Sequence, residues 1–363
     1  MRSTKVLITG SAGLIGSEAV RLFDEFGYEV HGIDNNLRER FFGPDGDTRW
    51  NLELLTTETN AFTNHNLDIR DAAAVERLVQ DIKPDYTLHC AAQPAHDYAR
   101  RHPIIDFHVN VTGTVNLLEA CRKHIPESPF VFCSSSKVYG QANRIAHREL
   151  DTRFELVVDD SIKGLSRGGI AEDFPIDRGD GRGIYGTGKA AADLLVQEYG
   201  ETYGMPTICI RGNCMTGAGH SPAELHGFLA YLARCLMEGR TYNIIGYKGK
   251  QVRDNIHSFD YVNAMYMICL SPPAAGTVYN LGGGRENSVS ILEGGKLLEE
   301  LAGKRLYTNY VEQPRHGDHR FYISDTSRFR QDYPGWGLKW SLNEICLDLI
   351  ERFDRNEQTI DVC

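Results

Sequence analysis

A short apolar strand that runs into three evenly spaced glycines constrains the fold of this chain more than any other feature. The strand Lys5–Thr9 leads into Gly10, Gly13 and Gly16. In a strand–turn–helix unit the first glycine permits the tight turn, the second lets backbone approach a pyrophosphate, and the third lets the helix pack against its strand. The segment therefore predicts a dinucleotide site at the N-terminus of a helix that begins near Leu14.

A second apolar run ends in a carboxylate at the distance that such a site needs. Glu29–Asp34 is predicted to be a strand, and Asp34 falls about twenty residues after the glycines, where a ribose 2′-hydroxyl needs an acceptor. A carboxylate there would repel a 2′-phosphate, which favours NAD over NADP, although Arg38 and Arg40 nearby leave NADP open. The alternative is an ordinary strand–turn–helix unit without a ligand.

Apolar runs alternate with helical patterns through the first half of the chain. Several runs are too continuously apolar to have a solvent-facing side, as in parallel strands that are covered on both faces. The alternation predicts an α/β fold with a doubly wound parallel Rossmann sheet. The further strands expected are Tyr86–Cys90, Phe130–Ser134 and Thr207–Arg211, and the helices are Leu14–Phe26, Ala72–Asp81, Val109–Lys123 and Tyr185–Tyr203.

The length of 363 residues fits two domains. We expect an NAD-binding domain over residues 1–212. The polar stretch 141–183 is expected to be a loop over the cleft, and the chain is expected to return to this domain near residues 252–282. Residues 213–363 are expected to form mainly a smaller C-terminal α/β substrate-binding cap. Its expected elements are helices Glu224–Glu238 and Ser290–Leu301 and strands Tyr242–Ile245 and Val278–Leu281.

Charge and composition exclude several functions. A formal net charge of −10 without a long basic run argues against nucleic acid as a partner, so an anionic substrate would need a local arginine cluster. The nine cysteines show neither a CxxC pair nor metal-ligand spacing, which predicts packing roles for Cys90, Cys133, Cys209 and Cys269 and no metal site. No window is apolar enough to span a membrane and no signal segment precedes the first strand, so we expect a cytoplasmic protein.

Several residues that could bind a ligand or take part in catalysis follow the expected strands, at the edge where open α/β sheets bind their ligands. These residues are Gly10, Asp34, Asp68, Ala91, Ser134 and Arg211.

A tyrosine and a lysine lie four residues apart at the start of an expected helix. Tyr185 and Lys189 would share one helix face, where a nearby ammonium and a cationic nicotinamide favour phenolate and make the tyrosine a general base. Such a pair also occurs by chance on surfaces. The serines of Phe132–Ser136 could hydrogen-bond a substrate hydroxyl or ketone, or could simply form a cap or turn.

Together these residues resemble the extended short-chain dehydrogenase/reductase superfamily in its nucleotide-sugar-modifying branch, over nearly the whole chain. Further matching segments are His89–Gln93, Val109–Gly113 and Arg253–Asp260. Within the branch the chain most resembles the CDP-paratose (CDP-tyvelose) 2-epimerases, through Ser134–Gly140, Gly249–Asp254, Arg315–Arg320 and Ile323–Asp325.

The resemblance implies a role for each matching residue. Ser135 stands at the active-site Ser/Thr, Tyr185 at the base, and Lys189 at the partner of the tyrosine and of the cofactor ribose. With Tyr185 and Lys189, the expected NAD contacts are Gly10, Gly13, Leu14, Ile15, Gly16, Asp34, Asn35, Asp68, Ile69, Ala91, Ala92, Gln93, Asn110 and Ser134.

A nucleotide-diphosphate sugar is the substrate that the resemblance implies. Arg253 is the main candidate for clamping its diphosphate, because a guanidinium grips phosphate oxygens bidentately. Arg211 could instead belong to a buried ion pair, and His226 could also face the cleft. The expected substrate contacts are Ser135, Ser136, Lys137, Arg211, Asn213, His220, Arg253, Arg315 and Arg320.

Lys137 helps to choose the reaction. Related 4,6-dehydratases carry an Asp-Glu pair after the active-site Ser/Thr for water elimination, whereas this chain has Ser136 and Lys137. An epimerase needs only one base and a returning hydride. Lys137 itself could be catalytic, solvated or bound to phosphate.

The expected reaction is a transient oxidation. Tyr185 takes a proton from a sugar hydroxyl while hydride passes from the same carbon to NAD. Ser135 holds the ketone, and hydride then returns to the other face of that carbon. The resemblance implies that this carbon is C2 of a CDP-linked hexose. Gly188, where relatives carry serine, and Cys214–Gly217 depart from the usual pattern and leave the sugar open. A UDP- or GDP-sugar 4-epimerase and a non-catalytic dinucleotide-binding protein remain alternatives. The resemblance also implies a homodimer through the helices Val109–Lys123 and Tyr185–Tyr203.

Overall fold

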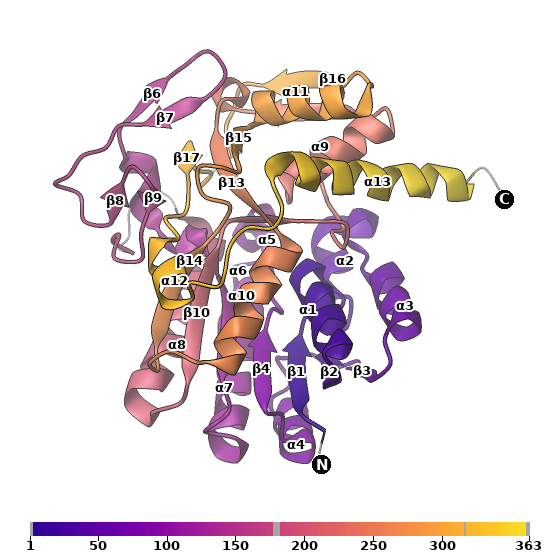
Figure 1. Cartoon of the computed structure of the whole chain (residues 1–363), viewed down its shortest axis with the longest axis vertical. Helices are drawn as coiled ribbons and strands as arrows, with labels where there is room; N and C mark the ends of the chain where they lie inside the picture. The colour runs from indigo at the N-terminus through magenta and orange to yellow at the C-terminus, as the bar shows by residue number, and fades with distance from the viewer. Residues whose placement is uncertain (1–2, 177–181, 316, 361–363) are drawn as a thin grey trace. The chain divides into compact units, whose positions relative to one another are not determined.

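The computed structural model of the chain describes residues 3–176, 182–315 and 317–360 and divides into two compact units (Figure 1). The first comprises Met1–Val138, Gly183–Gly212 and Tyr261–Tyr279, and the second comprises Tyr139–Arg182, Asn213–Asp260 and Asn280–Cys363. The stretch 141–182 thus groups with the second unit, whereas the sequence suggested a loop of the first. Residues 177–181 of that stretch lie outside the described residues.

A seven-stranded parallel sheet forms the centre of the first unit, which confirms the expected α/β class. Its strand order is β14-β10-β5-β4-β1-β2-β3, so the direction in which strands are added reverses between β1 and β4. Open sheets bind ligands at the carboxyl ends of the strands beside such a reversal. The strands are β1 Lys5–Thr9, β2 Glu29–Ile33, β3 Phe62–His65, β4 Tyr86–His89, β5 Phe130–Ser135, β10 Thr207–Gly212 and β14 Thr277–Leu281.

Helices flank the sheet on its faces (Figure 1). Several of them, such as α1 and α4, are amphipathic, because one apolar side packs on the strands while the other meets water. The helices are α1 Leu14–Glu25, α2 Leu37–Phe42, α3 Arg49–Glu58, α4 Ala72–Ile82, α5 His96–Arg101, α6 Pro103–Phe107, α7 Gly113–His124, α8 Gly183–Tyr203 and α10 Ser258–Leu270.

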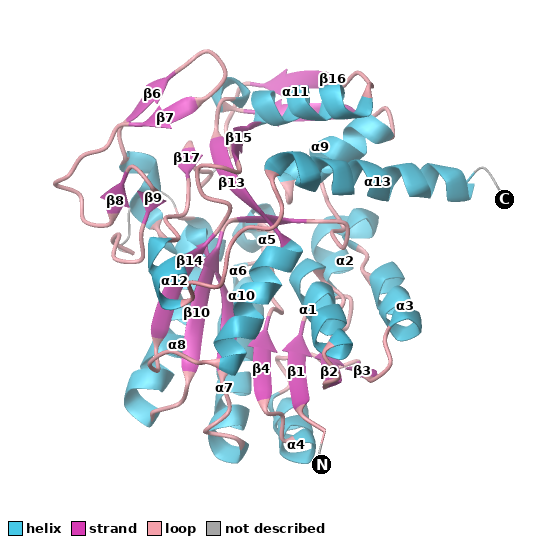
Figure 2. Cartoon of the chain, viewed as in Figure 1, coloured by secondary structure: helices cyan, strands magenta, loops and turns pink. Residues whose placement is uncertain are grey.

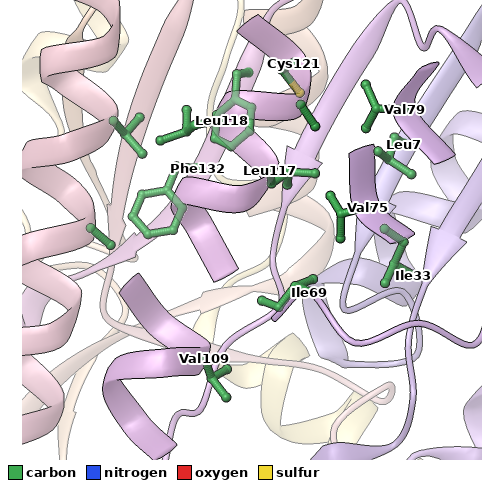
Figure 3. Close-up of a cluster of buried hydrophobic side chains, with 14 of the residues drawn as sticks. Leu7, Ile33, Ile69, Val75, Val79, Val109, Leu117, Leu118, Cys121 and Phe132 are labelled. Carbon is green, nitrogen blue, oxygen red and sulfur yellow. The ribbon is translucent and has the colours of Figure 1, made fainter. Parts of the chain in front are cut away.

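The core of the first unit lies between the sheet and the helices α4, α7 and α8. Leu7 of β1 and Phe132 of β5 are fully buried against Val75 of α4 and Leu117 of α7 (Figure 3). Continuous apolar strands are required here because both faces of the sheet are covered. This packing holds the strand ends, and the residues that follow them, in fixed positions.

Two expected helices differ at their N-terminal ends from what their periodicity suggested. Val109–Lys123 is split into the π-helical turn η2, His108–Thr112, followed by α7. The expected helix Glu224–Glu238 starts at Phe228 as α9, Phe228–Met237, because Gly227 before it takes a left-handed conformation with φ 81°. A backbone turn therefore overrides the apolar spacing at that end.

The second unit contains a four-stranded sheet with β13 at its centre and a separate parallel pair, β12 with β16. Figure 2 shows short paired strands, β6 with β7 and β8 with β9, in the stretch expected to be a loop. The strands are β6 His147–Glu149, β7 Phe154–Leu156, β8 Leu165–Ser166, β9 Gly169–Ile170, β11 Cys214–Thr216, β12 Thr241–Ile245, β13 Val252–His257, β15 Ser288–Ser290, β16 Tyr307–Val311 and β17 Phe321–Tyr322.

Three helices form the main core of the second unit. Leu232 of α9, Leu298 of α11 and Ile345 of α13 are fully buried in one cluster. A capping box formed by Ser290 and Glu293 starts α11 and satisfies free backbone N–H groups. The remaining helices are α11 Ile291–Ala302, α12 Ser327–Asp332 and α13 Leu342–Ile360, and the short 3₁₀ turns are η1 Gly43–Gly46, η3 Ser136–Val138, η4 Gly140–Arg144 and η5 Tyr247–Gly249.

The third glycine of the opening motif allows α1 to meet the turn that precedes it. A Cβ atom on Gly16 would lie 2.0 Å from the carbonyl oxygen of Gly10. We expect Gly16→Ala to lower the free energy of unfolding by about 3 kcal/mol, because backbone on both sides must shift. Chemical denaturation of the full chain measures this. Gly337→Ala is the matched control, since a Cβ there meets nothing within 4 Å; an equal loss in both variants would contradict the close-packing explanation.

Candidate functional site

The glycine turn presents the N-terminus of α1 at the carboxyl end of β1. Gly10 takes φ +70° and its N–H donates to the carbonyl of Ile33 at 2.7 Å, so the turn also joins the end of β2. Gly13 is the N-cap of α1 and brings no side-chain hydrogen bond to it. The first backbone N–H groups, of Leu14 and Ile15, have no acceptor within the helix, which suits a phosphate.

Asp34 lies beside this turn at the end of β2. Its carboxylate accepts hydrogen bonds from the backbone N–H of Ala12 at 3.0 Å and of Asn36 at 2.8 Å. Burial raises the pKa of Asp34, while those two hydrogen bonds and the charge of Arg38 oppose the rise. The structure therefore brings Asp34 and the glycine turn together, with Arg38 within electrostatic range.

The other residues expected near the adenosine lie after β3. Asp68 pairs with Arg70, with 2.5 Å between Oδ2 and Nη2, and the amide of the exposed Asn35 is 3.4 Å from the same carboxylate. Ile69 is buried, and a Cβ on Gly113 would lie 2.6 Å from its Cδ1 atom. Asp68 and Asn35 thus meet at the strand ends, whereas Ile69 packs against the start of α7.

Gln93 and Asn110 form a buried amide network. The side chain of Asn110 accepts from the N–H of Gln93 at 2.9 Å and donates to its carbonyl at 3.0 Å. Both side-chain amides also donate to Oδ1 of Asp106, at 2.8 and 2.9 Å. These contacts hold the loop after β4 to η2. The N–H of Ala91 in the same loop donates to Thr9 Oγ1 at 3.1 Å, which places this loop, including Ala92, next to the glycine turn.

Ser135, Tyr185 and Lys189 come together at the carboxyl end of β5. The Ser135 side chain interacts with the phenol of Tyr185 and favours its ionised form. Lys189 Nζ donates to the carbonyl of Cys133 at 2.8 Å and lies 4.1 Å from the ring centroid of Phe132. Both side chains project from α8, one helical turn apart, as their spacing predicted. The N–H of Lys137 donates to Ser135 Oγ at 3.2 Å, while Ser136 is buried.

Burial shifts the pKa values of Tyr185 and Lys189 in this trio. Burial raises the pKa of Tyr185; the interaction with Ser135 opposes this, and the negative charge of Asp106 adds to it. Burial also lowers the pKa of Lys189, although the neighbouring Cys133 favours its charged form. The phenol is therefore the stable form of Tyr185 until further positive charge arrives.

Ser134 and Arg211 hold the helix of the trio in place. The Ser134 hydroxyl donates to Asp193 Oδ2 at 2.5 Å, and Arg211 Nη2 lies 2.7 Å from Asp193 Oδ1. All three side chains are buried. Of the two roles considered for Arg211, the structure shows the buried ion pair, and Ser134 is engaged in the same network.

The remaining expected substrate residues belong to the second unit. Asn213 donates to Asp254 at 2.6 Å, and Arg253 is buried, pairs with Asp318 at 2.7 Å and donates to the carbonyl of His319. The exposed Arg320 stacks on the ring of Tyr247, 5.3 Å from its centroid. His220 is buried with its ring 5.5 Å from that of His226, and Arg315 is half-buried in the loop before Asp318.

Two residues near the trio were missed by the sequence analysis. The ring of His96 lies 4.6 Å from that of Tyr185, and Asp106 influences both Tyr185 and Lys189. Asp106 is one helical turn before Asn110, a spacing that could have indicated it. His96 stands in a short helix without periodic signal.

Within the described ranges, no group of three or more His, Cys, Asp or Glu side chains is arranged to hold a metal ion. Among those same residues, no helix has the length and apolar character needed to cross a membrane.

Comparison with known proteins was made on both sequence and structure. The family model for the NAD dependent epimerase/dehydratase family matches residues 6–158 and 166–282. CDP-paratose 2-epimerase of Salmonella typhi is 30% identical over 96% of this chain and 97% of that protein, and dTDP-glucose 4,6-dehydratase of Salmonella typhimurium is 30% identical over 92% and 88%. The UDP-glucose 4-epimerase of Thermus thermophilus, in complex with NAD, has a TM-score of 0.75 at 25% identity over 97% of this chain and 99% of that one.

Asp106 carries a buried carboxyl oxygen, Oδ2, that has no hydrogen-bond partner, and burial raises the pKa of Asp106 to about 6. Because this pKa exceeds that of the unfolded chain, its contribution to stability is present below pH 4 and lost as the pH rises through 6. It amounts to about 3 kcal/mol. We expect Asp106→Asn to remove this part of the pH dependence.

Urea unfolding of both proteins between pH 4.5 and 7.5 measures the effect, with the exposed Asp81→Asn as control. The difference between wild type and Asp106→Asn should change across this range in favour of the variant at higher pH. A constant difference would show that ionisation of Asp106 does not lower the free energy of unfolding.

Proposed function

This chain belongs to the NAD dependent epimerase/dehydratase family, and on that premise we propose that it inverts C2 of a CDP-linked hexose. One observation carries the choice of epimerase over dehydratase. Ser135, Tyr185 and Lys189 meet at the end of β5, and the residues that follow Ser135 are Ser136 and Lys137. Water elimination needs an acid and a base at neighbouring carbons, and neither residue is a carboxylate.

The residues at the strand ends fit a dinucleotide. The uncapped N-terminus of α1 offers backbone N–H groups to a pyrophosphate, and the carboxylate of Asp34 beside it suits the two hydroxyls of an adenosine ribose. NAD supplies, when bound, an acceptor that takes hydride from the sugar and returns it. We assign Gly10, Gly13, Gly16 and Asp34 to this binding.

Tyr185 acts as the proton carrier in the proposed reaction. Its phenolate oxygen accepts the proton of the sugar 2-hydroxyl and becomes a phenol, and the ammonium of Lys189, one turn further along α8, stabilises the phenolate before that transfer. Burial alone favours the phenol, so the positive charge of Lys189 and of an oxidised nicotinamide is needed to make the phenolate accessible. This requirement links proton transfer to cofactor occupancy.

Ser135 is proposed to hold the oxygen at the reacting carbon. Its side chain interacts with Tyr185, so one donor and one base can reach the same substrate oxygen. After oxidation, the Ser135 hydroxyl donates a hydrogen bond to the ketone oxygen of the sugar. If the sugar turns its other face before hydride returns, the product is the epimer and the net redox change is zero.

Substrate recognition is proposed to use the arginines of the second unit. Arg253 keeps its charge at any working pH, and its guanidinium can grip two phosphate oxygens. In the structure this guanidinium is paired with Asp318, so binding of a diphosphate requires that ion pair to open. The similarity to the Salmonella typhi enzyme supports a CDP-sugar, while Arg315 and Arg320 are the candidates to join Arg253.

A 4-epimerase acting on a UDP- or GDP-sugar is the second candidate. It uses the same trio with the sugar held in another register, and the Thermus thermophilus UDP-glucose 4-epimerase shares the fold over nearly the whole chain. A homodimer is also proposed, since Ile104 and Phe107 of α6 and Leu194 of α8 are large apolar side chains that are about half exposed or more. A cytoplasmic location remains the expectation from the sequence.

Replacing the proposed base tests the role of the trio. We expect Tyr185→Phe to lower kcat/KM on the order of 10²–10⁴-fold, because proton transfer by a positioned side chain contributes that much. Tyr203→Phe, at the exposed end of the same helix, is the control and should keep activity roughly unchanged. Wild-type turnover in Tyr185→Phe would remove the tyrosine from the mechanism.

The substrate is tested by supplying CDP-, UDP- and GDP-hexoses in D₂O and following the products by NMR. We expect inversion at C2 of a CDP-hexose with no deuterium at the inverted carbon, because hydride returns from the cofactor and not from solvent. Inversion at C4 of a UDP- or GDP-sugar would establish the second candidate instead. Loss of water from the sugar would identify a dehydratase and overturn the argument from Ser136 and Lys137.

A further inference from the structure

Cys90 and Cys133 lie side by side at the carboxyl edge of the sheet. Strands β4 and β5 are parallel with His89 opposite Phe132, so the two cysteines are the next residues along each chain. Neighbouring strands are about 4.8 Å apart, which is within the Cα separation of about 4.4–6.8 Å that a disulfide spans. The two thiols lie close enough to shift each other's pKa, and the sulfur of Cys133 also lies 3.4 Å from the hydroxyl oxygen of Tyr261.

The Cys133 thiol differs from the buried cysteines of the chain, whereas the interaction with Cys133 and burial raise the pKa of Cys90 well above its ordinary value. Burial raises the pKa of Cys121 and of Cys346 to about 12, as expected for thiols that only pack. In contrast, the interaction with Cys90 lowers the pKa of Cys133 despite burial, and the nearby charge of Lys189 acts in the same direction. Both Cys90 and Cys133 are partly exposed. A cysteine beside a lysine with access to solvent is the environment in which thiolates react.

The pair is also joined to the catalytic trio by backbone. The carbonyl of Cys133 accepts the hydrogen bond from Lys189 Nζ at 2.8 Å, and Ser135 follows two residues later. Cys90 precedes Ala91, whose backbone N atom would lie 2.9 Å from a Cβ on Gly10. Any change in the backbone at these cysteines therefore reaches both the lysine and the glycine turn.

We propose that Cys90 and Cys133 form a peroxide-sensitive dithiol that closes into a disulfide and reversibly inactivates the site. The thiolate of Cys133 attacks a peroxide oxygen, so an S–O bond forms while the O–O bond breaks and hydroxide leaves. The Cys90 sulfur, losing its proton, then attacks the sulfenic sulfur of Cys133, and the oxygen leaves as water. The two thiols lose two electrons and two protons, and one peroxide becomes two waters.

The geometry of parallel strands makes this disulfide reversible. Adjacent side chains on parallel strands keep about the strand spacing of 4.8 Å between their Cβ atoms, which exceeds the mean of about 3.8 Å in disulfides. The bond must pull the two strand ends together and is strained. Strained disulfides are the more easily reduced ones, so a dithiol reductant restores the free pair.

The test treats the reduced full-length protein with hydrogen peroxide and measures NAD affinity by thermal shift and disulfide content by mass spectrometry. These readouts do not depend on which sugar is the substrate. We expect one Cys90–Cys133 link, at least tenfold weaker NAD binding, and recovery of both after dithiothreitol. Prior saturation with NAD should slow the reaction severalfold, since the pair lies at the proposed cofactor edge.

Variants make the outcome specific. Cys90→Ser should stop at a sulfenic acid on Cys133 that dimedone traps, and Cys133→Ser should resist peroxide. Cys214→Ser, which alters another partly exposed cysteine, should behave as wild type and is the control. Unlinked Cys90 and Cys133 after treatment, or a link that leaves NAD binding unchanged, would overturn the proposal. If Cys133→Ser fails to fold, the Cys90→Ser result with dimedone decides the matter.

Discussion

The hydrogen bonds to the Asp193 carboxylate are the interactions on which the arrangement of the proposed catalytic trio depends. Asp193 lies on α8, is fully buried, and accepts hydrogen bonds from Ser134 at the end of β5 and from Arg211 at the end of β10. A buried charge that loses its partner costs about 3–5 kcal/mol, so the helix cannot slide or rotate without breaking this network. Tyr185 and Lys189 stand two turns and one turn before Asp193 on the same helix. Their positions over the end of β5 therefore follow from an ion pair that takes no part in the chemistry.

A second theme is that burial sets the electrostatics of the site. Tyr185, Lys189 and Asp106 are all buried, and in each case burial shifts the pKa in the direction that favours the neutral form of the side chain. Burial therefore favours the phenol of Tyr185, and in the proposed mechanism Lys189 and the cofactor supply the positive charge that favours the phenolate. In that proposed mechanism the base becomes effective only when the hydride acceptor is present.

Prediction from sequence succeeded where the signal was local. The glycines of β1–α1 and the carboxylate of Asp34 occur at spacings that a strand–turn–helix unit imposes, and Tyr185 and Lys189 are four residues apart on one helix. It fell short where a role depends on distant partners. Arg211 could not be assigned between substrate contact and ion pair until Asp193 was seen beside it. His96 was missed because α5 is only one and a half turns long, and the stretch 141–183 was taken as a loop because strands of two or three residues leave no alternation to detect.

The sequence by itself determined the α/β class and the strand–turn–helix unit with its glycines, because each depends on periodicity or spacing over a few residues, and the family followed from motifs along nearly the whole chain. Only the tertiary structure decided which polar side chains face each other: Asn110 with Gln93, Asp193 with Arg211, and Cys90 with Cys133. Those pairs join separate segments, and their energies depend on how far water is excluded around them. Neither the partner nor the degree of burial is encoded in local spacing, since both arise when the strands assemble into one sheet.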